Sequence, residues 1–178
     1  MNTDNATHHS RARLTGLVYL CYFVTAIGGV TLGKKDFIIA GHMVDIISIL
    51  CYLAVTVLFY RLFEPVQKSL SLIAALFSAT GCVLTALNTF HVTDAATPLL
   101  FFGPYCILLG LLIARSTFLP RFLGIVLVIA GLGWVLLLLS PPELLSLITK
   151  GFGFLSELSL MLWLLIKGVD EGKWLRLQ

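Results

Sequence analysis

Six long apolar runs constrain the fold of this chain more than any motif does. Each run is about 17 to 24 residues long, and an α-helix of that length crosses a hydrocarbon core of about 30 Å. Lipid admits only helices or closed barrels, and the runs show no alternation typical of strands. The sequence therefore predicts an all-α fold, a bundle of six transmembrane helices. The runs lie at Leu14 to Leu32, Phe37 to Tyr60, Ser69 to Phe90, Pro98 to Ala114, Phe122 to Leu139 and roughly Gly151 to Val169.

Composition agrees with a membrane protein. Hydrophobic residues make up 58% of the 178 residues, charged residues make up 12%, and the mean hydropathy is +0.99. A soluble domain does not tolerate so little polar surface. The loops are too short to hold a second domain. We therefore expect one six-helix domain at residues 13–169, with a polar N-terminal tail at 1–12 and a C-terminal tail at 170–178.

The basic residues predict the orientation of the chain. If the N-terminus is inside, nine Lys and Arg fall on cytoplasmic segments and three on outer loops, as the positive-inside rule requires. Both termini are therefore expected in the cytoplasm. The net charge of +3 is spread around the inner rim and gives no indication of a nucleic-acid partner. The inner set is Arg11, Arg13, Arg61, Lys68, Arg115, Arg121, Lys167, Lys173 and Arg176, and the outer set is Lys34, Lys35 and Lys150.

Local signals predict helix ends and contacts. The segment Ser140-Pro-Pro-Glu143 has capping-box spacing, which predicts that the fifth span ends near Leu139. A short interfacial helix is then expected from Pro141 to Ile148, before the sixth span begins near Gly151. Small residues in lipid usually mark the close approach of two helices, so glycines in the fifth span predict a tight neighbour. These are Gly124, Gly131 and Gly133.

The four cysteines lie near the middle of the first four spans, away from the loops where a disulfide framework would be placed. We interpret them as small apolar filler. They are Cys21, Cys51, Cys82 and Cys106.

Several blocks of sequence resemble a bacterial membrane family known only as a domain of unknown function. The resemblance runs from about Arg13 to Val169, and the loop residues within it are more specific than the leucines around them. It implies a multi-pass protein of the bacterial plasma membrane and carries over no catalytic residue. The blocks are RLTGLVYLCYFVTAIGG, LFYRLFEPVQKSLSLIAALF, GPYCILLGLLIARSTFLPRFLGIVLVIAGLGW and SELSLMLWLLIKGV.

Polar residues form stripes on the spans, which predicts that these faces look into the bundle. In the second span His42 and Asp45 share a face that continues through Ser48, Tyr52 and Thr56. The third span carries Ser78, Thr85 and Asn88, with His91 just beyond, and the sixth carries Glu157. The first span adds Thr15, Tyr19 and Tyr22.

Helical rise then predicts the depth of these groups. His42, Asp45, Asn88 and Glu157 come out roughly 6 to 12 Å below the outer surface, and His91 falls at the rim. We therefore expect a polar pocket in the outer half of the membrane, with candidate catalytic residues and candidate ligand-binding residues. The catalytic set is Asp45, Glu157, His42 and His91; the ligand-binding set is Asn88, Tyr22, Tyr52, Tyr105 and Trp134.

Three readings of this pocket stay open. The first is an acid/base enzyme, of isomerase, cyclase or hydrolase type, acting on a lipid-like or isoprenoid substrate. The second is a small proton-coupled carrier or a small-molecule receptor, because intramembrane acids and histidines also serve proton relays. The third is a purely structural polar core. The expected partners are the lipid bilayer and a hydrophobic small molecule.

The cofactor is left open. A divalent metal held by His42, Asp45, His91 and Glu157 is compatible with the spacing, although no dense ligand motif supports it. A haem held between His42 and His91 is disfavoured, because Asp45 and Asn88 occupy positions where a macrocycle prefers apolar contact. The sequence leaves the oligomeric state open.

Overall fold

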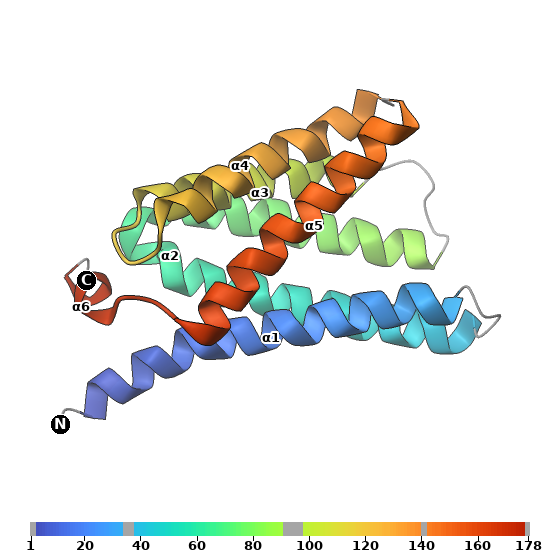
Figure 1. Cartoon of the computed structure of the whole chain (residues 1–178). Helices are drawn as coiled ribbons and strands as arrows, with labels where there is room; N and C mark the ends of the chain where they lie inside the picture. The colour runs from blue at the N-terminus through green and yellow to red at the C-terminus, as the bar shows by residue number, and fades with distance from the viewer. Residues whose placement is uncertain (1–2, 34–37, 91–97, 140–141, 177–178) are drawn as a thin grey trace.

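The computed structural model describes residues 3–33, 38–90, 98–139 and 142–176, and within these every regular element is helical. The long helices lie side by side as a bundle, with a short helix at one end (Figure 1). Their bounds are α1 Thr3–Gly33, α2 Ile38–Thr89, α3 Leu99–Arg115, α4 Arg121–Leu136 followed by the 3-10 turn Leu137–Leu139, α5 Glu143–Ile166 and α6 Glu171–Leu175. The predicted all-helical fold is confirmed.

Helix α2 contains the second and third predicted spans as two arms of one hairpin. Its 52 residues bend at Gln67, where φ is −162° and ψ is 98°, two positions after Pro65. Pro65 has no backbone N–H to donate, so the helix lacks one hydrogen bond in the turn before this bend. The arms, 38–66 and 68–89, run back along each other (Figure 1). They are joined by a buried hydrogen bond of 2.6 Å between the hydroxyls of Thr56 and Ser78.

Glycines bring α3 and α4 together. A Cβ added at Gly110 would lie 2.6 Å from the carbonyl oxygen of Gly124, and one added at Gly131 would lie 2.7 Å from the carbonyl oxygen of Gly103. The two backbones therefore touch, which only glycine permits. The predicted close approach at Gly124 and Gly131 is confirmed. Gly133 packs instead against the side chain of Thr149 on α5.

Helix α5 crosses the bundle and contacts two different partners. Its first half lies on α4, through the contact of Gly133 with Thr149, and its second half lies on α1, where a Cβ at Gly16 would sit 2.7 Å from the backbone nitrogen of Leu165. Figure 1 shows α5 passing diagonally over α1 and α2. The predicted separate interfacial helix at Pro141 to Ile148 is wrong, because α5 is continuous from Glu143.

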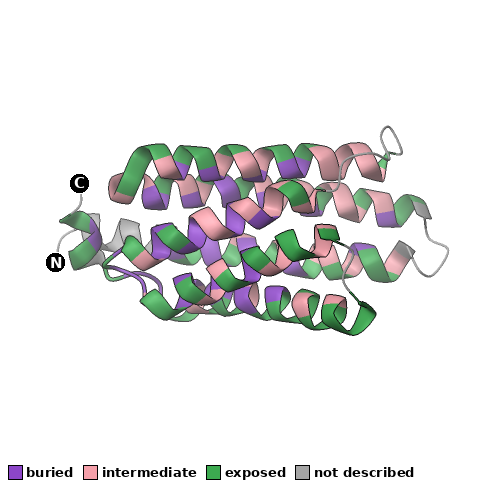
Figure 2. Cartoon of the chain, turned by 90° about the horizontal axis from the view of Figure 1, so that it is seen from above, coloured by how far each residue is buried: buried purple, intermediate pink, exposed green. Residues whose placement is uncertain are grey.

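Burial follows the faces of the helices. Buried residues line the faces turned toward the other helices, and exposed residues lie on the outside (Figure 2). The outer faces carry many large apolar side chains, such as Val24, Leu76 and Leu132, each more than half exposed. In the described part of the chain, four helices are long and apolar enough to cross a membrane, and α3 is a shorter apolar helix. The chain is therefore a helical membrane protein.

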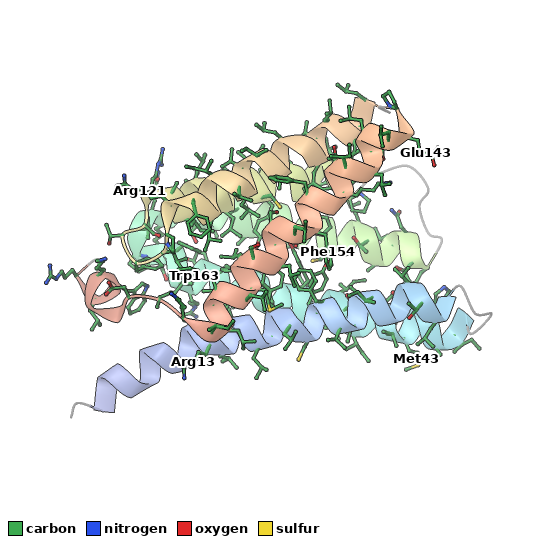
Figure 3. All side chains as sticks on the ribbon, in the orientation of Figure 1. Arg13, Met43, Arg121, Glu143, Phe154 and Trp163 are labelled. Atoms are coloured by element: carbon green, nitrogen blue, oxygen red, sulfur yellow. The ribbon has the colours of Figure 1, made fainter. Side chains whose placement is uncertain are left out.

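Charged residues gather at one end of the bundle. We call this the basic end; it holds Arg61, Lys68, Arg115, Arg121, Lys167 and Lys173. At the opposite, far end α1 finishes, α2 begins and α5 begins. Figure 3 labels Arg121 at the basic end and Met43 and Glu143 at the far end.

The short helix α6 closes the basic end. Gly168 has a φ of 69°, a conformation that glycine adopts without strain, and it turns the chain after α5. The indole nitrogen of Trp174 then donates a hydrogen bond of 2.9 Å to the carbonyl oxygen of Leu62 on α2. This contact ties α6 to the hairpin.

Candidate functional site

Glu157 lies at the centre of the candidate site. Its Oε2 accepts a hydrogen bond of 2.8 Å from the hydroxyl of Tyr19 on α1. Its Oε1 lies 3.8 Å from the Sγ of Cys106 on α3, at the distance of a weak thiol hydrogen bond. Tyr19 and Cys106 are almost completely buried, whereas Glu157 is half-buried. A carboxyl group from α5 thus joins three helices through two donors.

Aromatic rings surround this carboxyl group. The rings of Tyr22 and Tyr52 are 4.6 Å apart, and each lies about 6 Å from the ring of Tyr19. Tyr105 on α3 extends the cluster, with its ring 6.1 Å from that of Tyr52. Tyr22, Tyr52 and Tyr105 all lie within electrostatic reach of Glu157. Three of the five predicted ligand-binding residues therefore gather at one predicted catalytic residue.

Phe154 extends the aromatic wall along α5, less than one turn before Glu157. Its ring packs edge-on against Phe23 of α1 at 5.4 Å. Figure 3 labels Phe154 near the middle of α5. Tyrosines from α1, α2 and α3 therefore lie around the carboxyl group, and the aromatic packing continues along α5 through Phe154.

The site lies deep in the bundle. Counted from the far end at about 1.5 Å per residue, three residues share a depth of about 21 Å along their own helices. They are Tyr19 on α1, Tyr52 on α2 and Glu157 on α5. The sequence predicts a position for Glu157 much closer to the outer membrane surface, because it predicts that the sixth span begins near Gly151. The helix begins two turns earlier, so Glu157 lies near the middle of the apolar thickness.

Asp45 occupies a different level. Its Oδ1 packs directly against Gly29 of α1, at the position that a Cβ would fill. Asp45 also precedes Tyr52 by two helical turns, about 10 Å along α2. The structure therefore does not bring Asp45 and Glu157 together. The physical reason is that the close packing of α1 on α2 directs the carboxyl group of Asp45 toward a glycine.

The other polar candidates also lie away from Glu157. His42 is less than one turn before Asp45 on α2, and Asn88 is near the end of the same helix, and both are half-buried. His91 falls outside the described residues. The expected single layer is therefore divided among its described members: His42, Asp45 and Asn88 lie toward the far end, and the carboxyl group of Glu157 lies in the middle of the bundle.

Trp134 approaches the site from α4. A Cβ added at Gly153 of α5 would lie 3.0 Å from the indole nitrogen of Trp134, so the ring rests on that glycine. Gly153 is one turn before Glu157, so the two contacts share a face of α5. In the described chain, the nitrogen of Trp134 is the one buried side-chain nitrogen or oxygen that lacks a hydrogen-bond partner. A buried N–H group without an acceptor destabilises the folded protein, and an acceptor atom placed against it would remove that cost.

Tyr19 and Cys106 contact Glu157 but were not selected as site residues from the sequence. The sequence-based interpretation of Cys106 as apolar filler is wrong for this position, because its thiol contacts Glu157. The sequence does contain a signal for Tyr19, because Gly16, Tyr19 and Phe23 follow helical spacing. In the structure all three are buried. That spacing marks the inward face of α1.

The described residues offer no ready metal centre. Nowhere in the described ranges do three His, Cys, Asp or Glu residues come close enough together to hold an ion. The proposed ligand set of His42, Asp45, His91 and Glu157 includes one residue outside those ranges and two that lie far from Glu157. The chemistry available at the site is that of one carboxyl group, its tyrosine and thiol donors, and aromatic faces.

Comparison with known proteins agrees with the resemblance seen in the sequence. A model of DUF4386, a domain of unknown function, matches residues 32–100 and 96–168, well over half of the chain. An uncharacterized protein from Archaeoglobus fulgidus is 31% identical over 121 residues, which are 64% of this chain and 75% of that relative. A search of solved structures gave no significant match. The chain therefore belongs to the DUF4386 family, whose activity is unknown.

Proposed function

We propose that this protein binds a hydrophobic organic cation in the middle of the membrane and couples that binding to release of a proton, as a small carrier or receptor does. One observation carries the proposal. The half-buried carboxyl group of Glu157 lies among the rings of Tyr19, Tyr22 and Tyr52, at mid-depth in the bundle.

The combination of groups favours a cation. The face of an aromatic ring attracts a positive charge, and the attraction is worth about 2 kcal/mol or more where water is excluded. A carboxylate supplies the opposite charge. Apolar arms on the same ligand would be matched by Phe23 and Phe154, whose rings pack against each other between α1 and α5. The unpaired indole nitrogen of Trp134 adds a donor for an acceptor atom of the ligand.

Proton coupling follows from having one carboxyl group for two cations. Glu157 holds either a proton or the organic cation, because one carboxylate carries a single negative charge. An unbalanced charge inside the membrane is costly. The hydroxyl of Tyr19 donates to Oε2 in the described state and fixes the orientation of the carboxyl group. Binding of a permanent cation is therefore expected to strengthen as pH rises.

Equilibrium binding of tetrabutylammonium to the purified full-length protein tests this proposal. We expect Glu157→Gln to weaken binding by roughly tenfold or more, because the loss of about 1.4 kcal/mol already gives that factor. Asp45→Asn is the matched control, since it removes a carboxyl group from another level and should leave binding unchanged. Equal affinities for the wild type and Glu157→Gln, or an affinity that does not change with pH, would refute the proposal.

An acid/base enzyme acting on a lipid-like or isoprenoid substrate is the second candidate. The 2.8 Å hydrogen bond between Tyr19 and Glu157 favours it, because such a pair can exchange a proton with a substrate. The predicted partners His42 and Asp45 lie on another level, so this mechanism now relies on Tyr19 and Glu157 alone. Mass spectrometry of co-purified lipid before and after incubation distinguishes the two candidates, since an enzyme changes the mass or the isomer of its ligand and a carrier does not.

We further infer that the basic end faces the cytoplasm, with both termini inside and the protein in a bacterial plasma membrane. The support is the positive-inside rule, applied to the residues that form the basic end. Reporter fusions at residue 178 and within the 91–97 segment test the orientation. The same reporter state at both positions would contradict it.

A further inference from the structure

A second site lies at the basic end, outside the Glu157 cluster. A pocket of about 380 Å³ is formed where the turn between α3 and α4 meets the end of α5 and the start of α6. Its lining includes Phe118, Pro120, Trp163, Lys167, Asp170 and Lys173. The volume falls within the range of small-molecule sites, roughly 300 to 1,000 Å³. Neither the proposed function nor the packing of the spans requires a pocket here.

Two lysines give the pocket its charge. The Nζ of Lys167 lies 5.0 Å from the centre of the Trp163 ring, in a cation–π arrangement. The Nζ of Lys173 pairs with Asp170 at 3.0 Å. The hydrogen bonds that Asp170 accepts from Lys173 hold the pKa of its carboxyl group below the usual range, so this pair is ionic at neutral pH. The ammonium group of Lys173 is therefore already balanced by a carboxylate, whereas that of Lys167 lies over the Trp163 ring.

The backbone fixes the shape of the pocket. The amide nitrogen of Asp170 donates a hydrogen bond of 3.2 Å to the carbonyl oxygen of Phe118, which joins the start of α6 to the turn between α3 and α4. The positive φ of Gly168 allows this return of the chain. Lys167 and Lys173 are thereby held on opposite sides of one turn and line the same hollow.

An apolar surface adjoins the pocket on the side of the bundle. The ring of Phe122 packs edge-on against Trp163 at 5.9 Å and is itself 54% exposed. Ile166 is 67% exposed on α5 beside them. Cationic groups at the mouth and exposed apolar groups along the helices match a molecule with an anionic head and hydrocarbon chains.

We propose that this pocket binds the phosphate headgroup of an anionic phospholipid. Lys167 and Lys173 contact the phosphate, and the acyl chains lie along Phe122 and Ile166. Basic pockets between transmembrane helices on the cytoplasmic side are favourable places for such headgroups. The occupant is a lipid rather than a free phosphate, because the apolar surface continues directly from the charged mouth.

The carboxyl group of Asp170 makes the proposal sharply testable. It neutralises Lys173 and repels a phosphate, so its removal should strengthen lipid binding. Asn also caps helices well, and Asp170→Asn therefore preserves the start of α6, where the side chain accepts a hydrogen bond from the Lys173 amide. A gain in affinity cannot arise from unfolding.

The test is a titration of the full-length protein in a neutral detergent with dioleoylphosphatidylglycerol, with dioleoylphosphatidylcholine and with inorganic phosphate. We expect the anionic lipid to bind most tightly. Lys167→Gln and Lys173→Gln should each weaken its binding roughly fivefold, and Asp170→Asn should strengthen it severalfold. Lys150→Gln is the control, since Lys150 is an exposed lysine on α5 toward the far end, and it should have no effect.

Three results would overturn the proposal. Equal affinities for the anionic and the zwitterionic lipid would show that the pocket does not recognise the charge of the headgroup. Unchanged affinity in both pocket lysine variants would place the lipid elsewhere. Phosphate binding as tight as lipid binding would make the pocket a site for free anions. The thermal unfolding temperature of each variant is measured alongside, so that weakened binding is assigned to the pocket only when the protein remains folded.

Discussion

The hydrogen bond between Tyr19 and Glu157 permits a quantitative prediction. Tyr19→Phe keeps the buried ring and removes only the hydroxyl that lies 2.8 Å from Oε2. Hydrogen bonds between transmembrane helices contribute about 0.6 kcal/mol on average and up to about 1.7 kcal/mol. We expect a value near the upper limit, about 1 to 2 kcal/mol, because the substitution also leaves Oε2 of the half-buried carboxyl group without the donor that Tyr19 supplies.

The assay is a double-mutant cycle of Tyr19→Phe with Glu157→Gln, with the free energy of unfolding measured in mixed micelles. Two residues in contact show a coupling energy, whereas independent residues are additive. Tyr60 and Glu64 form the control cycle, since their side chains are the same two types but the bond is 3.4 Å long and partly exposed on one helix. Coupling at Tyr19 and Glu157 no larger than in this control would refute the proposed contact.

Three further predictions concern the scaffold. Gly124→Val should destabilise the protein by about 1 to 3 kcal/mol in the same unfolding assay, because its side chain enters the backbone of α3, whereas Gly151→Ala, in open space, should be neutral or stabilising. Trp174→Phe should cost about 0.5 to 1.5 kcal/mol by removing the hydrogen bond to the Leu62 carbonyl, and no loss in thermal unfolding would contradict the docking of α6. The pKa of Asp170 is lowered by its neighbouring lysine, so its contribution is complete above the unfolded pKa of about 4 and is lost as pH falls through the lower folded value. Acid titration of thermal stability should therefore show a component that Asp170→Asn lacks.

The apolar runs predicted the helices well because length and hydropathy report directly on burial in lipid. Helix bounds at the far end were harder to predict. Proline at 141 and 142 suggested a break, and the sequence cannot show whether the following helix lies along the surface or continues inward. In the structure Leu144, Leu147 and Ile148 are exposed apolar side chains on the first turns of a single tilted helix.

The candidate site was predicted only in part. The structure brings the half-buried carboxyl group of Glu157 together with Tyr22, Tyr52 and Tyr105, which are also selected from the sequence, and their part in binding or catalysis stays a prediction. Depth was the weak step, because an error of two turns in the start of α5 moves Glu157 by about 12 Å. The packing of neighbouring helices then determines which polar faces contact each other. The sequence of one helix does not contain that information.

The position of Asp45 illustrates the same limit. Its spacing from His42 places both on one face of α2, but the face is turned toward α1, where Gly29 leaves room for the carboxyl group. Two small residues at 28 and 29 were the available signal. They mark a close approach of helices, and a polar side chain opposite them can fill that space without reaching the centre of the bundle.

Labelling with a hydrophobic carbodiimide gives the most direct test of the central claim, that Glu157 is a ligand-accessible carboxyl group inside the membrane. Such a reagent modifies carboxyl groups in apolar surroundings, and peptide mass spectrometry identifies the modified residue. We predict that Glu157 is labelled and that tetrabutylammonium protects it in proportion to occupancy, without changing any labelling at Asp45. Absence of label at Glu157, or label that the cation does not reduce, would contradict the account.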